Sequence, residues 1–249
     1  MKLKVLALSS QEGALWYQHL RNALNNVGIE LICLTEVPET INLLKEEKFD
    51  LALVDSNTKD LENTCFRISW LCRIRLAVVA SDPQSDWSGL NAIGIDTIIY
   101  RTSTDDEIIA AIEDLGHKGR LHFPRIKVLV IEDDRFIRDA IKICFRIYWS
   151  EAEVNVAERG QEGIDLAQQK VPDLILLDLG LPDMSGFDVL NRIRSYSRIP
   201  IIMLTANRDG ENVVQAIQSG ANDYVVKPFK QMELMPRIRK VIDQLTLKK

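Results

Sequence analysis

The chain has 249 residues, of which 46% are hydrophobic and 27% charged, with a formal net charge of −5. These values are typical of a folded globular protein and leave room for one large domain or two ordinary ones. The first half is acidic and the second nearly neutral. Because neither half has the basic excess of a nucleic-acid binder, no direct nucleic-acid partner is expected.

The apolar stretches of the sequence are short. None reaches the length of a membrane span, and the N-terminal MKLKVLAL is too brief for a signal sequence. We therefore expect no membrane partner and a cytoplasmic location. The four cysteines form no CxxC pair and the three histidines no ligand pattern, which favours reduced thiols without a zinc site.

The first half alternates short β-branched runs with helical patterns, which predicts βα units on a parallel sheet. A capping box from Thr104 to Glu107 predicts the start of its last helix, which runs to about residue 115. The glycines of GHKGRLHFPR and Pro124 then mark a boundary, so we expect a first domain at 1–118, a linker at 119–124 and a second domain at 125–249. The predicted strands of the first half are 4–8, 30–34, 51–54, 76–80 and 96–100.

The second half repeats this scheme. Lys4 matches Lys127 and Asp55 matches Asp178, each at a shift of 123 residues, so an internal duplication is the economical explanation. We therefore predict an α/β fold of two doubly wound (βα)5 domains, each a five-stranded parallel sheet with helices on both faces. The predicted strands of the second half are 127–131, 153–156, 174–177, 201–204 and 224–226.

Charged and hydroxyl residues follow the strand ends of the second half. Glu132 and Asp133 follow its first strand, Asp178 its third, Thr205 its fourth and Lys227 its fifth. Chemistry in an open parallel sheet collects at the carboxyl ends of the strands, so these side chains are expected to meet. Clustered carboxylates repel unless a cation lies among them, and oxygen ligands suit Mg²⁺. The set therefore predicts phosphoryl transfer to a carboxylate, with Lys227 as a fixed positive charge.

Four stretches of the second half carry a family resemblance: VLVIEDD, LLDLGLPDMSG, IIMLTA and GANDYVVKPF. In this order and at these spacings they resemble the motifs of bacterial receiver domains, which have a flavodoxin-like (CheY-like) fold and act in response regulators. The resemblance implies that Asp178 is the phosphoacceptor and that Thr205 and Lys227 contact the phosphoryl group. It also implies that Mg²⁺ is held by Glu132, Asp133, Asp178 and the main-chain carbonyl of Gly180.

The resemblance further implies a role in two-component signalling. A sensor histidine kinase or phosphotransfer protein would supply the phosphoryl group, and Tyr224 would be the aromatic switch residue. The Lys227–Pro228 bond would be cis. Phosphorylation would reshape the face made by the fourth helix, fifth strand and fifth helix and control a homodimer or an output, with Asp223, Arg237 and Arg239 as candidate interface charges.

Other interpretations of this face remain open. Tyr224 could simply pack in the core, and the charged residues could be a solvated helix surface. Pro236 disfavours a helix interior unless the helix starts late enough to place it in the first turn.

The chain itself is not expected to be an enzyme. An output domain or downstream effector is expected, and by analogy it could be a diguanylate cyclase beyond this chain. Gly180 and Asn207 occupy positions that the family links to phosphoryl lifetime. Because Gly180 has no side chain to position an attacking water, slow self-dephosphorylation is expected.

The first half keeps one acid of the set and replaces the rest. A lone carboxylate is a poor Mg²⁺ site, so we predict a degenerate pseudo-receiver that takes no phosphoryl group and serves in dimerisation, partner docking or packing. The shift of 123 residues places Ser9, Ser10 and Asp55 at the positions of Glu132, Asp133 and Asp178. Later landmarks drift to a shift of 126, as Gly94 against Gly220 shows, which places Arg101 at the position of Lys227 and Ile98 at that of Tyr224. Ser81 falls approximately at the position of Thr205.

Two other functions remain as alternatives. In the first, neither half is phosphorylated and the chain is an adaptor. In the second, Asp178 is the nucleophile of an aspartyl-phosphate phosphatase, but such enzymes need a second acid at the position of Gly180. The acids at 132–134 could also only cap the following helix, and the turn at 9–13 could cradle a small anion.

Overall fold

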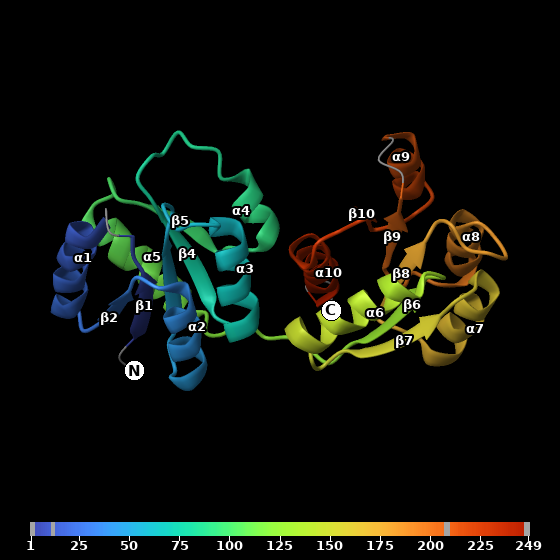
Figure 1. Ribbon diagram of the computed structural model, residues 1–249, viewed down its shortest axis with the longest axis horizontal. Helices are drawn as coiled ribbons and strands as arrows, with labels where there is room; N and C mark the ends of the chain where they lie inside the picture. The colour runs from blue at the N-terminus through green and yellow to red at the C-terminus, as the bar shows by residue number, and fades with distance from the viewer. Residues whose placement is uncertain (1–2, 11–12, 207–209, 247–249) are drawn as a thin grey trace. The chain divides into compact units, whose positions relative to one another are not determined.

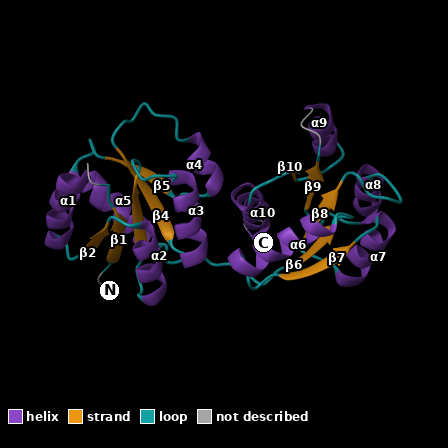
Figure 2. Ribbon diagram, viewed as in Figure 1, coloured by secondary structure: helices purple, strands orange, loops and turns teal. Residues whose placement is uncertain are grey.

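The computed structural model describes residues 3–10, 13–206 and 210–246. The chain divides into two compact units, Met1–His122 and Phe123–Lys249 (Figure 1). Strands and helices alternate strictly along both units, as the sequence patterns predict (Figure 2). The Asn207 position linked to phosphoryl lifetime lies outside the described residues.

The first unit contains five strands and five helices among its described residues. Its elements are β1 (Lys4–Leu8), α1 (Ala14–Asn26), β2 (Glu30–Leu34), α2 (Val37–Glu46), β3 (Leu51–Asp55), α3 (Leu61–Cys72), β4 (Arg75–Ala80), α4 (Ser88–Ile93), β5 (Thr97–Tyr100) and α5 (Asp105–His117).

The second unit repeats the order of the first. Its elements are β6 (Lys127–Ile131), α6 (Arg135–Tyr148), β7 (Glu153–Ala157), α7 (Gly160–Lys170), β8 (Leu174–Asp178), α8 (Gly186–Tyr196), β9 (Ile201–Thr205), α9 (Gly210–Gln218), β10 (Asp223–Val226) and α10 (Gln231–Thr246).

Each unit is built on one five-stranded, all-parallel sheet. The strand order is β2-β1-β3-β4-β5 in the first unit and β7-β6-β8-β9-β10 in the second, which is the same order in space. In the second unit α7, α8 and α9 pack on one face of the sheet, and α6 and α10 lie together on the other (Figure 1). The predicted α/β doubly wound fold is confirmed.

Strand position in the sheet explains the strand sequences. The central strands β3 (LALVD) and β8 (LILLD) are buried at every residue, because helices cover both faces. The edge strands β5 and β10 each bury one of their four residues. Strand ends are therefore sharply defined in the middle of each sheet, where an acid follows the apolar run.

Two predicted helix starts are present. Thr104 and Glu107 form the expected capping box at α5. Asp134 caps α6 by accepting hydrogen bonds from the backbone N–H groups of Phe136 and Ile137. The acids at 132–134 thus divide their roles, since only the last of them caps the helix.

The boundary segment packs onto both units in turn. The Leu121 N–H donates to the Arg73 carbonyl of the first unit at 3.0 Å. In the second unit, the Phe123 ring lies edge-on against Trp149, whose Nε1 donates to the Pro124 carbonyl at 2.8 Å. None of the helices in the described ranges is both long and apolar enough to cross a membrane.

Candidate functional site

The carboxyl edge of the second sheet brings the predicted site residues together. β6 ends before Glu132, β8 ends at Asp178 and β9 ends at Thr205. The sheet register pairs Asp178 with Leu204 and Thr205 with Val226, so Lys227 follows directly beyond the same edge. This convergence follows from the parallel sheet, since all strands end on the same side.

Three acids form a close group at this edge. Glu132, Asp133 and Asp178 each offer a carboxylate oxygen within 4.8 Å of the others. Glu132 and Asp178 are buried, at 0% and 5% exposure, whereas Asp133 is exposed. Such a group holds strong negative charge in a partly desolvated place, which favours a bound cation.

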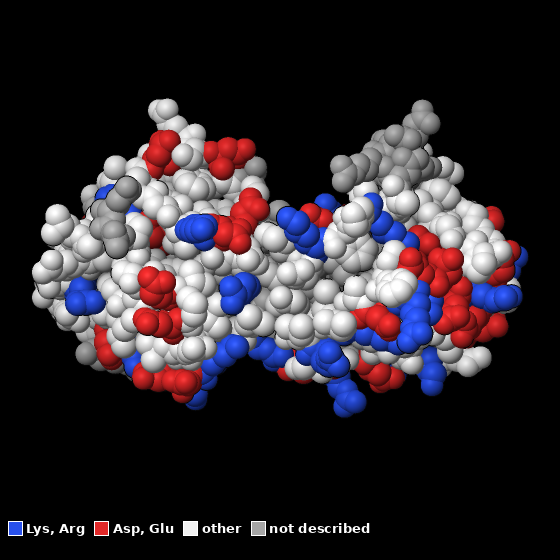
Figure 3. All heavy atoms as spheres, in the orientation of Figure 1, with Lys and Arg blue, Asp and Glu red and all other residues white. Residues whose placement is uncertain are grey.

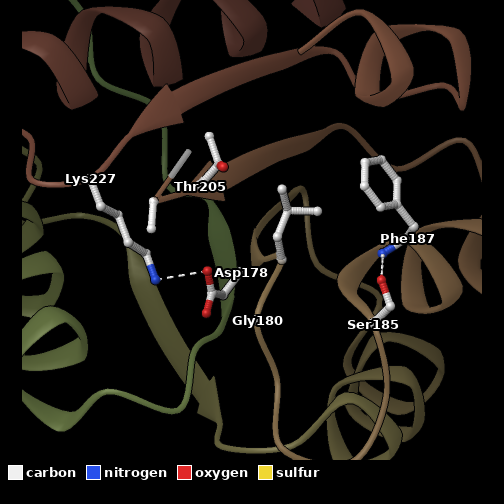
Figure 4. Close-up of a pocket in the computed structure, with 8 residues that line it drawn as sticks. Asp178, Gly180, Ser185, Phe187, Thr205 and Lys227 are labelled. Carbon is white, nitrogen blue, oxygen red and sulfur yellow. Dashed lines mark hydrogen bonds and ion pairs between the residues drawn. The ribbon is translucent and has the colours of Figure 1, made fainter. Parts of the chain in front are cut away.

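Lys227 supplies the only ammonium that the described residues bring into contact with these acids. Its Nζ lies 2.6 Å from Glu132 Oε2 and 2.7 Å from Asp178 Oδ1 (Figure 4). Burial raises the pKa of Glu132, and the charge of Asp178 adds to this, although Lys227 opposes both. Burial disfavours the charged form of Lys227, but its hydrogen bonds to Asp178 and Glu132 outweigh burial and raise its pKa.

The donor set fits a hard divalent cation. All three ligating groups are carboxylates, and a single lysine cannot balance three of them. Within the described parts of the chain, no group makes a hydrogen bond of normal geometry to Glu132 Oε2, which has only its ion pair with Lys227. A bound divalent cation would give the buried Glu132 Oε2 atom a second partner.

A pocket of about 460 Å³ opens beside Asp178. In Figure 4, Lys227 points toward Asp178 from one side, while Ser185 and Phe187 form the opposite wall. Gly180 also lines the pocket, and a Cβ added to it would lie 3.7 Å from Asp178 Oδ2. The volume accommodates a phosphoryl group and the waters of a hydrated cation.

Asp183 and Gly186, for which the sequence predicted no role, support the wall formed by Ser185 and Phe187. Asp183 accepts hydrogen bonds from the backbone N–H groups of Gly160 and Gln161, which anchors the 179–185 loop to the start of α7. At Gly186, an added Cβ would lie 2.2 Å from the Asp178 carbonyl oxygen, so only glycine lets α8 start there. The LPDMSG segment contains both residues, but their roles depend on contacts across the fold.

The predicted switch and interface residues lie on β10 and α10. Tyr224 is partly buried against the core, and the Arg237 guanidinium lies 5.6 Å from the centre of its ring. Arg237 also pairs with Asp223 at 2.8 Å, and Arg239 with Asp243 at 3.3 Å. The candidate interface charges are thus engaged within their own unit.

Two expectations about backbone geometry are settled. The Lys227–Pro228 peptide bond is cis, as expected. Pro236 does not fall in the first turn of a late-starting helix, because α10 begins at Gln231 and Pro236 lies inside it.

The first unit fills the equivalent edge differently. Asp55 is fully buried and forms an ion pair with Arg101. The hydroxyl of Ser10 donates to Asp55 Oδ2 at 3.0 Å, and the Asn57 N–H donates to Oδ1 at 3.0 Å. Both carboxylate oxygens of Asp55 are therefore already engaged. Burial, followed by the negative charge of Asp55, also raises the pKa of the neighbouring Tyr17.

The start of α1 lies close against the Asp55–Arg101 ion pair. A Cβ added to Gly13 would lie 2.6 Å from Asp55 Oδ2 and 2.7 Å from Arg101 Nη2. Trp16 Nε1 donates to the Arg101 carbonyl at 3.3 Å. Ser9 is buried and its hydroxyl donates to the Leu34 carbonyl, away from Asp55.

One predicted equivalence requires correction. The register pairs Asp55 with Val79, as it pairs Asp178 with Leu204. Ala80, rather than Ser81, therefore stands at the position of Thr205, and Ser81 is exposed one residue further on. The error arose because the shift between the halves changes from 123 residues at β3 to 125 at β4, inside a connection whose length the pattern did not reveal.

Comparison with known proteins finds a family match within the second unit. The family model described as the response regulator receiver domain matches residues 128–239. The transcriptional regulatory protein AfsQ1 of Streptomyces coelicolor is 44% identical over 115 residues, which cover 46% of this chain and 50% of AfsQ1. The DNA-binding response regulator MtrA of Mycolicibacterium smegmatis is 41% identical over 115 residues, with the same coverage. This chain thus spans about half the length of these relatives.

A solved structure of similar size to one unit is the chemotaxis protein CheY4 of Vibrio cholerae. It is 30% identical, covers 47% of this chain and 99% of its own, and has a TM-score of 0.44. Residues 128–239 therefore match the receiver-domain family of response regulators, and the acids and Lys227 at one sheet edge lie within the matched range.

Proposed function

We propose that the second unit accepts a phosphoryl group on Asp178 from a sensor histidine kinase or phosphotransfer protein. The observation that carries this proposal is the group of three acids and one lysine around Asp178. In the proposed step, an Asp178 carboxylate oxygen bonds to phosphorus while the phosphorus–nitrogen bond of the donor histidine breaks. An acyl phosphate forms, and the freed imidazole takes up a proton.

Glu132, Asp133, Asp178 and the Gly180 carbonyl are the proposed ligands of Mg²⁺. Bound there, the ion would neutralise the acids and hold phosphoryl oxygens. Lys227 lies close enough to Asp178 to exchange its present ion pair for one with the incoming phosphoryl group. Thr205 would donate its hydroxyl to a phosphoryl oxygen from the end of β9.

The proposed output of this reaction is a change in the face formed by α9, β10 and α10. Inward movement of the Thr205 hydroxyl would vacate space for the Tyr224 ring, and this shift would control dimerisation or an output. For Arg237 to act at an interface, it would first have to leave Asp223, with which it now pairs. The two packings would exist in equilibrium, and phosphorylation would change their populations.

The identity of the output is part of the proposal. MtrA is named as DNA-binding, so a DNA-binding output joins the diguanylate cyclase as a candidate. The residues of this chain are proposed not to contact nucleic acid themselves. On the face seen in Figure 3, acidic and basic side chains are interspersed over the described residues of the second unit.

The first unit is proposed to be a pseudo-receiver with a docking or dimerising role. Arg101 and Ser10 already engage the Asp55 carboxylate, and Ser9 and Ser10 stand where the second unit has Glu132 and Asp133. An incoming phosphoryl group would therefore meet an occupied carboxylate without a cation site.

The test is a measurement of intact mass after incubation with Mg²⁺ and a small phosphodonor. We expect one added phosphoryl group in the wild type and in Asp55→Asn, and none in Asp178→Asn. Modification that persists in Asp178→Asn would overturn the proposal. An unmodified wild type that also fails to bind beryllofluoride with Mg²⁺ would favour the adaptor instead, and multiple turnover of phosphomonoesters would favour the phosphatase.

The lifetime of the acyl phosphate is a separate part of the proposal. Gly180 offers no side chain to align a water with the phosphorus, so slow loss of the phosphoryl group is expected. Decay is followed by intact mass after removal of the phosphodonor, and a half-life of seconds would contradict the expectation.

A further inference from the structure

Arg138 is a buried cation next to the proposed metal site, and no role has been assigned to it. It lies in the first turn of α6, with 7% of its surface exposed. Its Nη1 group donates to the Glu132 carbonyl at 2.8 Å and to the Asp133 carbonyl at 2.7 Å. Its Nη2 group pairs with Glu158 at 2.5 Å.

These contacts determine the backbone from which two proposed metal ligands project. Two consecutive carbonyls that accept from one amino group constrain the peptide planes on both sides of Asp133, and thus its φ and ψ. The Glu132 side chain has further support, because its Oε1 accepts from the Asp134 N–H at 3.2 Å and its Oε2 pairs with Lys227.

Asp133 lacks such support. Within the described parts of the chain, no hydrogen bond or ion pair to its carboxylate is found, and the residue is exposed. The position of this carboxylate therefore depends on the main chain that Arg138 holds. Ordering it in advance would reduce the entropy lost when a cation binds.

We infer that Arg138 is a positioning residue, which places Asp133 for Mg²⁺ by binding the two carbonyls of its loop. The inference rests on the proposed Mg²⁺ site. It is consistent with the first unit, where the shift of 123 residues puts Leu15 at this position with 82% exposure and where two serines replace the acids. The arginine and the acids that it supports are absent together.

Charge and positioning predict opposite effects when Arg138 is replaced. Removal of a positive charge near the site would, by Coulomb's law alone, strengthen cation binding. Loss of the carbonyl contacts would instead weaken it, by about tenfold or more, as is usual for groups that orient metal ligands. The direction of the change therefore distinguishes the two effects.

The experiment is a calorimetric titration of the full chain with Mg²⁺, alongside thermal unfolding without metal. We expect Arg138→Met to bind Mg²⁺ about tenfold more weakly than the wild type, and Arg138→Lys, which keeps one amino group, to recover part of the loss. Glu158→Gln is the matched control. Because Glu158 is largely exposed and the carbonyl contacts of Arg138 remain, the Mg²⁺ affinity of this variant should stay within about twofold of the wild-type value.

A double variant tests whether Arg138 acts through Asp133. In an Asp133→Asn background, Arg138→Met should weaken binding by less than about twofold further, since the ligand that it positions is already lost. Equal or tighter binding by Arg138→Met, or a full tenfold loss in the Asp133→Asn background, would overturn the inference. If Arg138→Met unfolds, the Arg138→Lys and Glu158→Gln titrations decide instead. A wild type that binds no Mg²⁺ would overturn the proposed function, and this inference with it.

Discussion

The carboxyl edges of the two sheets differ in how their central aspartate is balanced. Asp178 shares Lys227 with Glu132, and Asp133 adds a third acid, so negative charge is in excess. Asp55 is fully buried and forms a one-to-one pair with the partly buried Arg101. The same strand order thus supports one edge with an excess of negative charge and one edge where a single arginine balances the central aspartate.

A retained aspartate is not by itself evidence for a phosphoacceptor, because its oxygens can already be engaged within the fold, as those of Asp55 are. Breaking a buried ion pair leaves an uncompensated charge and is costly, so Asp55 is held by the arginine that faces it. The planar guanidinium also reaches and binds differently from an ammonium. Gly13 lets α1 approach this pair closely, whereas Phe136, at the same shift of 123, is 85% exposed.

The largest expected effect comes from giving the second unit the serines of the first. The double variant Glu132→Ser/Asp133→Ser removes two of the three carboxylates and leaves only Asp178, paired with Lys227. Mg²⁺ affinity should fall by about 1,000-fold or more, because both charge and oxygen ligands are lost. Calorimetric titration measures this, with Asp55→Asn as the control that keeps wild-type affinity. A fall of less than about tenfold would mean that the ion binds elsewhere.

The next prediction compares stability at the two aspartates. Asp55→Asn should destabilise the first unit by about 3 kcal/mol, because Arg101, whose side chain is only 16% exposed, loses its counter-charge. Asp178→Asn should cost less than about 1 kcal/mol, since Lys227 keeps Glu132 and the repulsion between acids falls. Equal costs would remove the distinction between the two edges.

Tryptophan fluorescence during urea unfolding can separate the two units. Trp149 is the one tryptophan of the second unit, and the other three lie in the first. In a Trp149→Phe background, the signal therefore reports the first unit. Unfolding of the second unit is followed in the converse background, where only Trp149 remains.

A smaller effect is expected from Gly13→Ala. The new Cβ must push apart Asp55 and Arg101, which should cost about 1–3 kcal/mol of first-unit stability. Phe136→Ala, at the matching position of the second unit, should change stability by less than about 0.5 kcal/mol because its side chain is exposed. The same unfolding measurements apply, and a neutral Gly13→Ala would show that α1 can move away freely.

The smallest predicted effect is that of the cation itself. At a Mg²⁺ concentration ten times its dissociation constant, the second unit should gain about 1.4 kcal/mol and the first none. Unfolding with and without a chelator measures this difference. Stabilisation of the first unit by Mg²⁺ would contradict the closed character of its edge.

The sequence was sufficient to predict the strands, their alternation with helices and the duplication, because burial on both faces requires apolar runs of a definite length. It was also sufficient to predict that Glu132, Asp133, Asp178, Thr205 and Lys227 meet, because parallel strands end on one side. The Thr104 and Asp134 helix caps were predictable as well, because their hydrogen bonds join residues only two or three positions apart.

Tertiary structure alone decided the contacts between side chains from separate elements. The register showed Ala80 where Ser81 was expected, since a connection of unknown length precedes β4. The contact of Arg138 with two carbonyls, and the pairing of Arg237 with Asp223, depend on side-chain direction as well as spacing. Whether Arg101 would reach Asp55 was likewise not determined by residue type, because geometry and desolvation decide which charges pair.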